Sequence, residues 1–449
     1  MHETNKSARK RVSASEVLGD GSIAELIYDS KAKMTSFSVW HNDTLTFQDM
    51  LTDGALGMVY PFSPENNLIR NEIVLLASST EEYGSQEVLL RDITTYLHRY
   101  LDVSPLFEKV ASYYVLLTWI YDAFNELPYL RLRGDYGTGK TRALLTIGSL
   151  CYKATFASGA STVSPLFHTL DAFHGTLIID EADFRFSDAK TDIIKILNNG
   201  NVRGLPVLRT VMNNQREFNP RAFQVFGPKI VAARGSFDDR ALESRFITEE
   251  MGQRRLRSDV PINLPDAYRV EAQSLRNKLL LYRFRNLAQA KIDPTMIDPR
   301  LEPRLNQILV PLLSVVDDRS LRAELRQVAL GYQEALIADR GFTPEADVLE
   351  VLQELMADGR YSVSVGDLSS KMAERFAARY ERPITARWVG NLLRRKLRIM
   401  TWKMHGIYVV PRSEMAKLQL LWERYGIGDA RSGSPTEGVG GHGDVGTSE

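Results

Sequence analysis

The sequence predicts an α/β protein built on a parallel sheet flanked by helices, and three observations lead to this. Short apolar segments of strand length alternate with amphipathic helical segments between residues 129 and 246, the pattern of a parallel sheet covered by helices. A glycine-rich loop joins the first of these strands to the first helix. A later apolar strand ends in two carboxylates, Asp180 and Glu181.

The length of 449 residues is too great for one ordinary domain. Shifts in pattern divide the chain into five expected parts. These are an N-terminal accessory region (1–125), the α/β core (126–255), a helical lid (256–342), a compact C-terminal unit (343–427) and a disordered Gly/Ser-rich tail (428–449).

Charge and cysteine content restrict the partners. Lysine plus arginine and aspartate plus glutamate both number 56, so an anionic partner must be bound by a local basic patch. The single cysteine, Cys151, excludes an internal disulfide and suits a reducing compartment. The N-terminus lacks the apolar region of a secretory signal, and the most apolar run, residues 110–120, is too short to cross a bilayer. We therefore expect a cytoplasmic protein without a membrane partner.

Before the core, residues 20–85 show short alternating runs, such as 36–40 and 73–76, which predict some strand. Residues 86–126 have apolar side chains three or four positions apart, which predicts helices packed beside the core. The expected core elements are a strand at 129–133, a helix at 140–150, a strand at 154–158, a helix at 163–170, a strand at 176–180, a helix at 189–197 and a strand at 229–233.

The stretch RLRGDYGTGKTRALL contains the pattern G-x-x-x-x-G-K-[ST] between a strand and a helix, as a phosphate-binding loop requires. Backbone N–H groups would surround the β-phosphate, Lys140 would reach the β and γ oxygens, and the Thr141 hydroxyl would bind Mg²⁺. The alternative is a merely structural glycine turn. The residues expected around ATP are Gly134, Asp135, Tyr136, Gly137, Thr138, Gly139, Lys140, Thr141 and Arg142.

The stretch TLIIDEAD supplies the second half of the expected site. A wholly apolar strand delivers Asp180 and Glu181 to the carboxyl edge of a parallel sheet, where such folds bind ligands. Asp180 would hold Mg²⁺ and Glu181 would polarise the attacking water. Alternatively, the acidic pair only caps the following helix.

Three arginines follow the strand at 229–233: Arg234, Arg240 and Arg245. Together with the two motifs above, the segment DDRALESRF resembles the AAA+ ATPases over residues 125–335, and most of all the helicase-like AAA+ proteins of mobile genetic elements, which are distantly related to the replicative MCM helicases. The resemblance implies a homo-oligomeric ring, a hexamer, with Arg245 as the arginine finger and Arg304 as the sensor-2 arginine. Where family members carry a polar sensor 1, this chain has Ala232-Ala233-Arg234, and Arg234 is the expected substitute. Each arginine has a surface salt bridge as its alternative.

Residues 260–340 are helical in pattern, with breaks at Pro294, Pro299 and Pro303, which suits the lid. Earlier, two β-rich runs at 207–212 and 221–226 flank a polar turn, a hairpin pattern. Its location resembles the pore hairpin of helicase AAA+ proteins, and Arg209, Arg216 and Arg221 would then follow a DNA backbone. An ordinary solvated loop is the alternative.

The last unit reads as helices at 346–356, 365–380 and 385–397, followed by a short hairpin at 400–403 and 406–410. It resembles a winged helix-turn-helix over 345–425. Ten basic and two acidic residues lie between Lys371 and Lys403. Arg387, Asn391, Arg394 and Arg395 would contact DNA, although such units also dock proteins.

The set Lys140, Asp180, Glu181 and Arg245 favours ATP turnover over passive sensing. The sequence therefore predicts an ATP-hydrolysing motor on DNA, a replicative-type helicase of a mobile element, with ATP and Mg²⁺ as cofactors and DNA and replication proteins as partners. Two alternatives stay open: a helicase loader or other DNA-bound remodelling ATPase, and an ATP-sensing transcriptional regulator.

Overall fold

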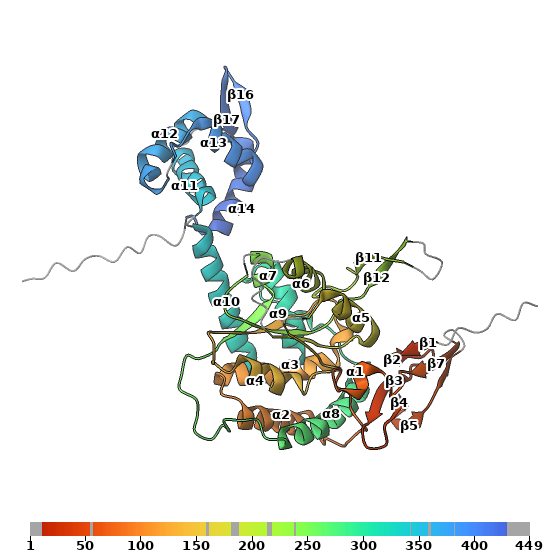
Figure 1. Ribbon diagram of the computed structural model, residues 1–449. Coiled ribbons are helices and arrows are strands. Elements are labelled where there is room, and N and C mark those ends of the chain that lie inside the picture. The colour runs from red at the N-terminus through yellow and green to blue at the C-terminus, as the bar shows by residue number, and fades with distance from the viewer. Residues whose placement is uncertain are drawn as a thin grey trace, which may run out of the picture. The chain divides into compact units, whose positions relative to one another are not determined.

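In a computed structural model the chain forms two compact units, Met1–Arg326 and Gln327–Glu449 (Figure 1). The boundary falls inside a long helix, α10 (Arg319–Gly341). The residues that the structure describes are 11–53, 57–158, 161–180, 188–212, 218–237, 239–341, 343–357, 361–380 and 382–428.

The core of the first unit is a five-stranded sheet in the order β14-β8-β13-β10-β9, and every neighbouring pair is parallel. The predicted α/β class is confirmed, and the strands predicted here are found within two residues of their expected limits. Because all five strands run in the same direction, their carboxyl ends share one edge. The strands are β8 (Tyr129–Arg133), β9 (Thr155–Ala157), β10 (Leu177–Ile179), β13 (Lys229–Ala233) and β14 (Phe246–Glu250).

Helices follow the first three core strands in turn. They are α4 (Lys140–Gly148), α5 (Val163–Phe173) and α6 (Asp188–Asn199). A short helix, α7 (Arg240–Glu243), precedes β14. Leu177 and Ile179 of β10 pack with Phe167 of α5 and Ile196 of α6 in one buried cluster, which explains why this strand is wholly apolar.

A second set of helices packs around α3 (Pro105–Trp119), most of whose side chains are buried. This helix contacts α2 (Gln86–Tyr100), α8 (Ala267–Asn286) and α9 (Pro303–Val315). The helical pattern predicted for 86–126 and for 260–340 is thus confirmed. Short 3₁₀ turns lie at Tyr121–Ala123 and Pro294–Met296. No helix in the described part of the chain is both long and apolar enough to span a membrane.

The N-terminal residues form two small sheets. One is antiparallel, in the order β2 (Ser15–Val17), β3 (Ile23–Asp29), β4 (Met34–His41), β5 (Thr44–Gln48). The other has the order β1 (Arg11–Ser13), β7 (Gly57–Pro61), β6 (Leu51–Asp53), and α1 (Asn67–Arg70) follows it. The predicted run 36–40 lies in β4, but 73–76 is not a strand. Only Val74 pairs there, in a single bridge to Thr155 at the edge of β9.

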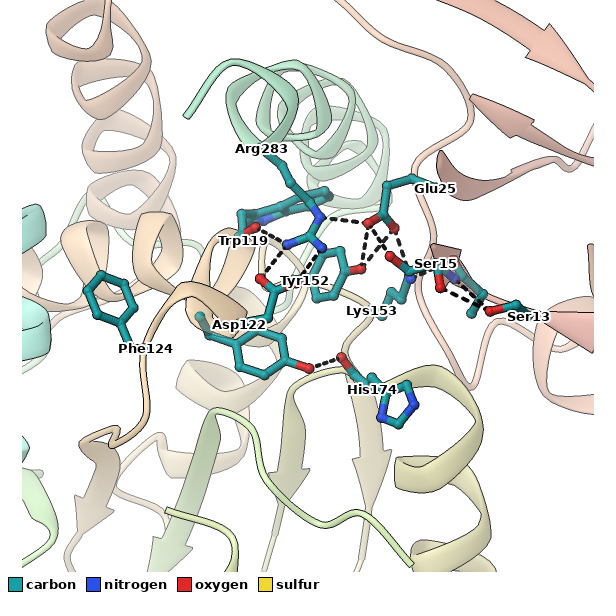
Figure 2. A network of polar contacts seen from close by, with 12 residues as sticks. Ser13, Ser15, Glu25, Trp119, Asp122, Phe124, Tyr152, Lys153, His174 and Arg283 are labelled. Atoms are coloured by element: carbon teal, nitrogen blue, oxygen red, sulfur yellow. Dashed lines mark hydrogen bonds and ion pairs between the residues drawn. The ribbon is translucent and has the colours of Figure 1, made fainter. Parts of the chain in front are cut away.

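A buried ionic network joins the small antiparallel sheet to the core (Figure 2). Glu25 of β3 is 1 % exposed, and its carboxylate accepts from Arg283 Nε at 2.6 Å and lies 2.9 Å from Lys153 Nζ. The Ser15 hydroxyl donates to the same carboxylate at 2.6 Å and the Tyr152 hydroxyl at 2.8 Å. Burial alone would raise the pKa of Glu25, but the charges of Arg283 and Lys153 outweigh burial and hold it below the ordinary value.

The other side of Arg283 reaches the end of α3. Its guanidinium donates to the Trp119 carbonyl at 2.7 Å and to both oxygens of Asp122, at 2.8 and 2.6 Å (Figure 2). Two carboxylates, the buried Glu25 and the partly exposed Asp122, therefore balance the two buried cations Lys153 and Arg283. Buried charges are tolerated only when they are paired in this way, so the network fixes β3, α3 and α8 relative to one another.

The second unit has a small core of its own, built from residues such as Val348, Leu368, Val389 and Leu393. Its helices are α11 (Pro344–Ala357), α12 (Val365–Phe376), α13 (Ala386–Asn391) and α14 (Met415–Tyr425), with 3₁₀ turns at Ala377–Arg379 and Arg412–Glu414. A π-helical turn, Leu392–Lys396, extends α13.

An antiparallel sheet completes the second unit in the order β15 (Ser362–Ser364), β17 (Ile407–Pro411), β16 (Trp402–Met404). The three helices and the hairpin that the sequence predicts are found. Thr385 caps the third helix as expected, accepting from Trp388 N at 3.3 Å. Strand β15 and helix α14 were not predicted.

Candidate active site

The loop between β8 and α4 has the geometry of a phosphate-binding loop. It begins at Gly134 and ends at Gly139, whose left-handed backbone, φ 88°, immediately precedes the first residue of α4. A Cβ at Gly134 would meet the Met251 carbonyl at 2.8 Å, so this position also requires glycine. The backbone N–H groups of the loop are therefore not covered by side chains at these glycines, at a helix N-terminus where anions bind.

The side chains of Lys140 and Thr141 are both fixed at this loop. Lys140 Nζ donates to the carbonyls of Gly134 at 2.7 Å and Asp135 at 2.6 Å. The Thr141 hydroxyl donates to Asp180 Oδ2 at 2.7 Å. Asp180 directly follows β10, so two motifs that are forty positions apart in the sequence meet at one edge of the sheet. Glu181 lies outside the described residues.

A hydroxyl and a carboxylate oxygen in contact are ligands that suit Mg²⁺. Among the described residues, no group of three or more His, Cys, Asp or Glu side chains could hold a metal ion. An ion at Thr141 and Asp180 would therefore take its other ligands from water and from a bound phosphate chain, which is how Mg²⁺ is ordinarily held in nucleotide sites.

The loop borders a cleft of about 890 Å³. Part of its lining comes from two segments that the sequence did not mark, around Ser104 and around Glu249. Ser104 donates to Glu249 through its backbone N–H and its hydroxyl, both at 2.6 Å, and Arg254 Nε donates to Asp102 at 2.8 Å. The lining also includes Tyr136, Gly137, Thr138, Gly139, Lys140, Thr141, Arg142, Asp180, Arg234, Glu250, Met251 and Ile262.

Arg142 also lines the cleft. Its guanidinium donates to the carbonyls of Pro261 and Ile262 and thereby fixes the chain that leads into α8. Asp102, Ser104, Glu249 and Arg254 are distant from the phosphate loop in the sequence and match no motif. No local signal in the sequence marks them.

Arg234 and Tyr136 form a stacked pair in the cleft. β13 lies between β8 and β10, so Arg234, at its carboxyl end, lies between the phosphate loop and Asp180. The Arg234 guanidinium carbon is 3.6 Å from the centre of the Tyr136 ring, within the range of a cation–π interaction. The predicted sensor-1 substitute thus lies in the cleft, held by a residue of the phosphate loop.

Arg245 and Arg304 do not line this cleft. Arg245 donates to the Leu197 carbonyl at 3.2 Å and to the Asn198 side chain, at the end of α6. Arg304 donates to the Ala241 carbonyl at 2.5 Å, in α7. Burial is the main cause that lowers the pKa of Arg245, and the nearby charge of Arg304 lowers it further. The structure thus brings the two arginines together at α7.

Asp239 lies near enough to Arg245 for its charge to raise the pKa of Arg245, but neither arginine forms a direct salt bridge within the described part of the chain, and the Nε of each is buried without a hydrogen-bond partner there. An unpaired buried donor is costly, so two such donors beside each other favour an anionic partner from outside this chain.

The hairpin of β11 (Val207–Met212) and β12 (Phe218–Phe223) is antiparallel as predicted, but its second strand begins and ends three residues earlier than expected. Arg209 and Arg221 lie opposite each other and face α5. Arg209 stacks on Phe167, and Arg221 pairs with Asp171 at 3.0 Å. The other face exposes Leu208 and Phe218. Arg216 and the turn lie outside the described residues.

Lys229, the first residue of β13, is fully buried beneath this hairpin. Its Nζ donates to the carbonyls of Gly200 at 3.2 Å, Val225 at 2.9 Å and Gly227 at 2.9 Å. Burial lowers its pKa to about 7. One side chain thus ties the end of α6 to the segment that leaves the hairpin.

In the second unit the basic residues fall into two groups. Lys371, Arg375 and Arg379 are paired with carboxylates of α11, those of Glu354, Glu350 and Asp347. The predicted DNA-contacting residues Arg387, Asn391, Arg394 and Arg395 are all exposed, on the side of the third helix that faces away from the core. The excess positive charge therefore lies on this helix.

The comparisons with known proteins yield structures but no family. No protein-family model and no curated protein matches the chain. Among solved structures, the chain is similar to the NrS-1 C-terminal region (13 % identity, 86 % of this chain and 96 % of that chain covered, TM-score 0.36). It is also similar to the SCCmec type IV Cch active helicase (13 %, 76 % and 70 %, 0.30) and to JCV helicase (15 %, 56 % and 64 %, 0.23).

Proposed function

We propose that the chain is an ATP-hydrolysing motor that acts on DNA, a replicative-type AAA+ helicase of a mobile element related to the MCM helicases. The observation that carries the proposal is the convergence of Lys140, Thr141 and Asp180 at the carboxyl edge of the sheet, with the Thr141 hydroxyl 2.7 Å from the Asp180 carboxylate. This arrangement suits a Mg²⁺-bound nucleoside triphosphate.

Each residue has a defined task in this proposal. The backbone N–H groups of the loop bind the β-phosphate, and the Lys140 ammonium exchanges its two carbonyl partners for β and γ oxygens. Thr141 and Asp180 would hold Mg²⁺, which neutralises charge on the phosphates when it is bound. Arg234 lies where its charge would stabilise the γ-phosphate in the transition state, and Glu181 would orient the attacking water.

The proposal includes a ring, a hexamer. Arg245 and Arg304 lie away from the cleft of their own chain, beside each other and without a direct salt bridge among the described residues. Two such arginines suit the γ-phosphate in a neighbouring subunit's cleft, where a finger contributes about 10³-fold or more to the rate. In this view Arg304 acts with Arg245 on the neighbour, and it does not bind the nucleotide of its own chain.

The second unit would supply DNA contact. Its order of helix, strand, helix, helix and hairpin is that of a winged helix-turn-helix, and its third helix presents the exposed basic residues. The β11–β12 hairpin would line the pore. A helicase loader has the same cleft and the same basic unit, so it is the second candidate function. A cytoplasmic location and replication proteins as partners stay predictions.

The test measures ATPase rate with no DNA, with single-stranded DNA and with duplex DNA, and strand displacement on a forked substrate. We expect hydrolysis that DNA stimulates and that Lys140→Ala abolishes together with nucleotide binding, while Lys109→Ala, on an exposed part of α3, has no effect. Glu181→Gln should bind ATP and hydrolyse it about 100-fold more slowly.

Unchanged nucleotide affinity in Lys140→Ala would refute the site. DNA-stimulated hydrolysis without strand displacement would favour the loader, and nucleotide binding without any turnover would favour a sensor.

A further inference from the structure

The β16–β17 hairpin carries an apolar tip in solvent. Trp402 pairs across the hairpin with Val409, and Met404 pairs with Ile407, so these four side chains share one face. Val409 is buried, but Trp402 is 53 %, Met404 44 % and Ile407 55 % exposed. Only Val409 on this face is covered, and the other three side chains are in water.

The hairpin is built to protrude. Its turn is His405-Gly406, with φ of 48° and 86°, the left-handed pair of a tight two-residue turn. Met404 and Ile407 flank this turn directly, so they form the tip. Figure 1 shows the hairpin extending beyond the helices of its own unit. The hairpin therefore protrudes with apolar side chains at its end.

The opposite face is basic and aromatic. Lys403 pairs across the hairpin with Tyr408. The Arg394 guanidinium lies 5.5 Å from the centre of the Tyr408 ring and donates to the Thr401 hydroxyl at 3.1 Å, so it links this face to the third helix. The exposed cations Arg387, Arg395, Lys396 and Arg398 continue from there, without a carboxylate partner in the described part of the chain.

A partner that binds the hairpin must match both its apolar face and its basic face. An exposed apolar patch marks a binding surface. The exposed cations beside it favour a partner with closely spaced negative charge. DNA provides both where its bases are unstacked, because apolar side chains insert between base steps while neighbouring cations hold the phosphates. An intact duplex would offer the tip only phosphates and groove edges.

We propose that the exposed apolar face formed by Trp402, Met404 and Ile407, with Met404 and Ile407 at its tip, is a wedge that binds DNA at a junction between paired and unpaired strands. The wedge contacts the exposed bases of the last pair, and the third helix holds the phosphates of the adjoining duplex. The inference rests on the proposed DNA contact of this unit, but it does not depend on ATP hydrolysis or on ring assembly.

The experiment compares the full chain on a forked DNA and on a fully paired duplex of the same length. A 2-aminopurine at the junction reports unstacking. We expect the wild-type chain to bind the fork more tightly and to brighten the probe. Truncating a residue that stacks on a base costs about 1–3 kcal/mol, which is roughly 5- to 150-fold in affinity. For Trp402→Ala and for the double variant Met404→Ser/Ile407→Ser, affinity for the fork should therefore fall at least about fivefold, while affinity for the duplex should fall less than about twofold.

The matched control is Leu420→Ser, which removes an exposed apolar side chain of α14 (67 % exposed) and should change neither affinity. Circular dichroism of each variant checks the fold, and the exposed positions should leave it intact. Unchanged fork affinity in the tip variants, or an equal loss on fork and duplex, would overturn the wedge. If the wild-type chain bound neither DNA, the proposed DNA contact itself would be refuted.

Discussion

The buried network around Glu25 leads to a quantitative prediction for Glu25→Gln. The substitution keeps the shape of the side chain and removes its charge, which leaves Lys153 and Arg283 facing each other with Asp122 as the single remaining carboxylate. Removing one partner of a buried pair costs about 3–5 kcal/mol, because the charge that remains, here that of Lys153, is neither paired nor hydrated. We therefore expect the free energy of unfolding to fall by about that amount.

The chain contains a matched control two positions away on α8. Arg285 binds Glu82 through two hydrogen bonds, at 2.7 and 2.6 Å, just as Arg283 binds Asp122, but the Glu82 side chain is 62 % exposed. An exposed pair contributes about 1 kcal/mol or less, so Glu82→Gln should have a small effect. Urea unfolding followed by circular dichroism measures both variants.

The network also gives a pH dependence with a definite sign. The pKa of Glu25 is lower in the folded protein than its ordinary value of 4.5, so its contribution to stability is full above pH 4.5 and is lost as the pH falls below that value. The Glu25→Gln variant should lack this part of the acid loss. An equal, small loss of stability in Glu25→Gln and Glu82→Gln would refute the reasoning.

Three further predictions concern the cleft and the basic helix. Arg245→Ala should bind ATP normally but hydrolyse it about 10³-fold more slowly. Mixing it with Lys140→Ala should restore part of the activity, because some subunit interfaces then pair an intact phosphate loop with an intact arginine finger. Normal turnover by Arg245→Ala alone would exclude the finger. Tyr136→Leu should lower kcat with little change in KM. Tyr136→Phe should keep the wild-type rate, since the ring face that stacks on Arg234 needs no hydroxyl. Equal rates in both variants would show that the stacking has no catalytic effect. Arg395→Ala should reduce the slope of log affinity for duplex DNA against log salt concentration by about 0.9, the value for one phosphate contact. Arg375→Ala should leave this slope unchanged, because the Arg375 charge is already paired with Glu350. The same change in both variants would contradict the division of the basic residues into paired and unpaired groups.

The sequence predicted those parts of the molecule that depend on local spacing. The phosphate loop is one: its glycines, Lys140 and Thr141 are fixed relative to β8 and α4 by a few bonds. Apolar runs located the core strands for the same reason. The run at 73–76 was misread because its apolar side chains serve packing, and only Val74 pairs with a neighbouring strand.

The rest depends on contacts between distant segments. Asp102 and Arg254 form one wall of the cleft across about 150 positions of sequence. Glu25 and Arg283 are charged residues, which usually lie on the surface, so nothing in their neighbourhood indicates that they are buried. Arg304 was expected to be the sensor-2 arginine because its position along the chain suits a lid helix, but only the packing of α9 shows that its side chain meets α7.

The three carbonyl contacts of Lys229 have a mechanical consequence. They join the end of α6, which begins eight positions after Asp180, to the exit of the β11–β12 hairpin. A single ammonium keeps all three bonds only if the two segments shift together. If the end of α6 moved, the base of the hairpin would therefore have to move with it or lose a hydrogen bond to Lys229.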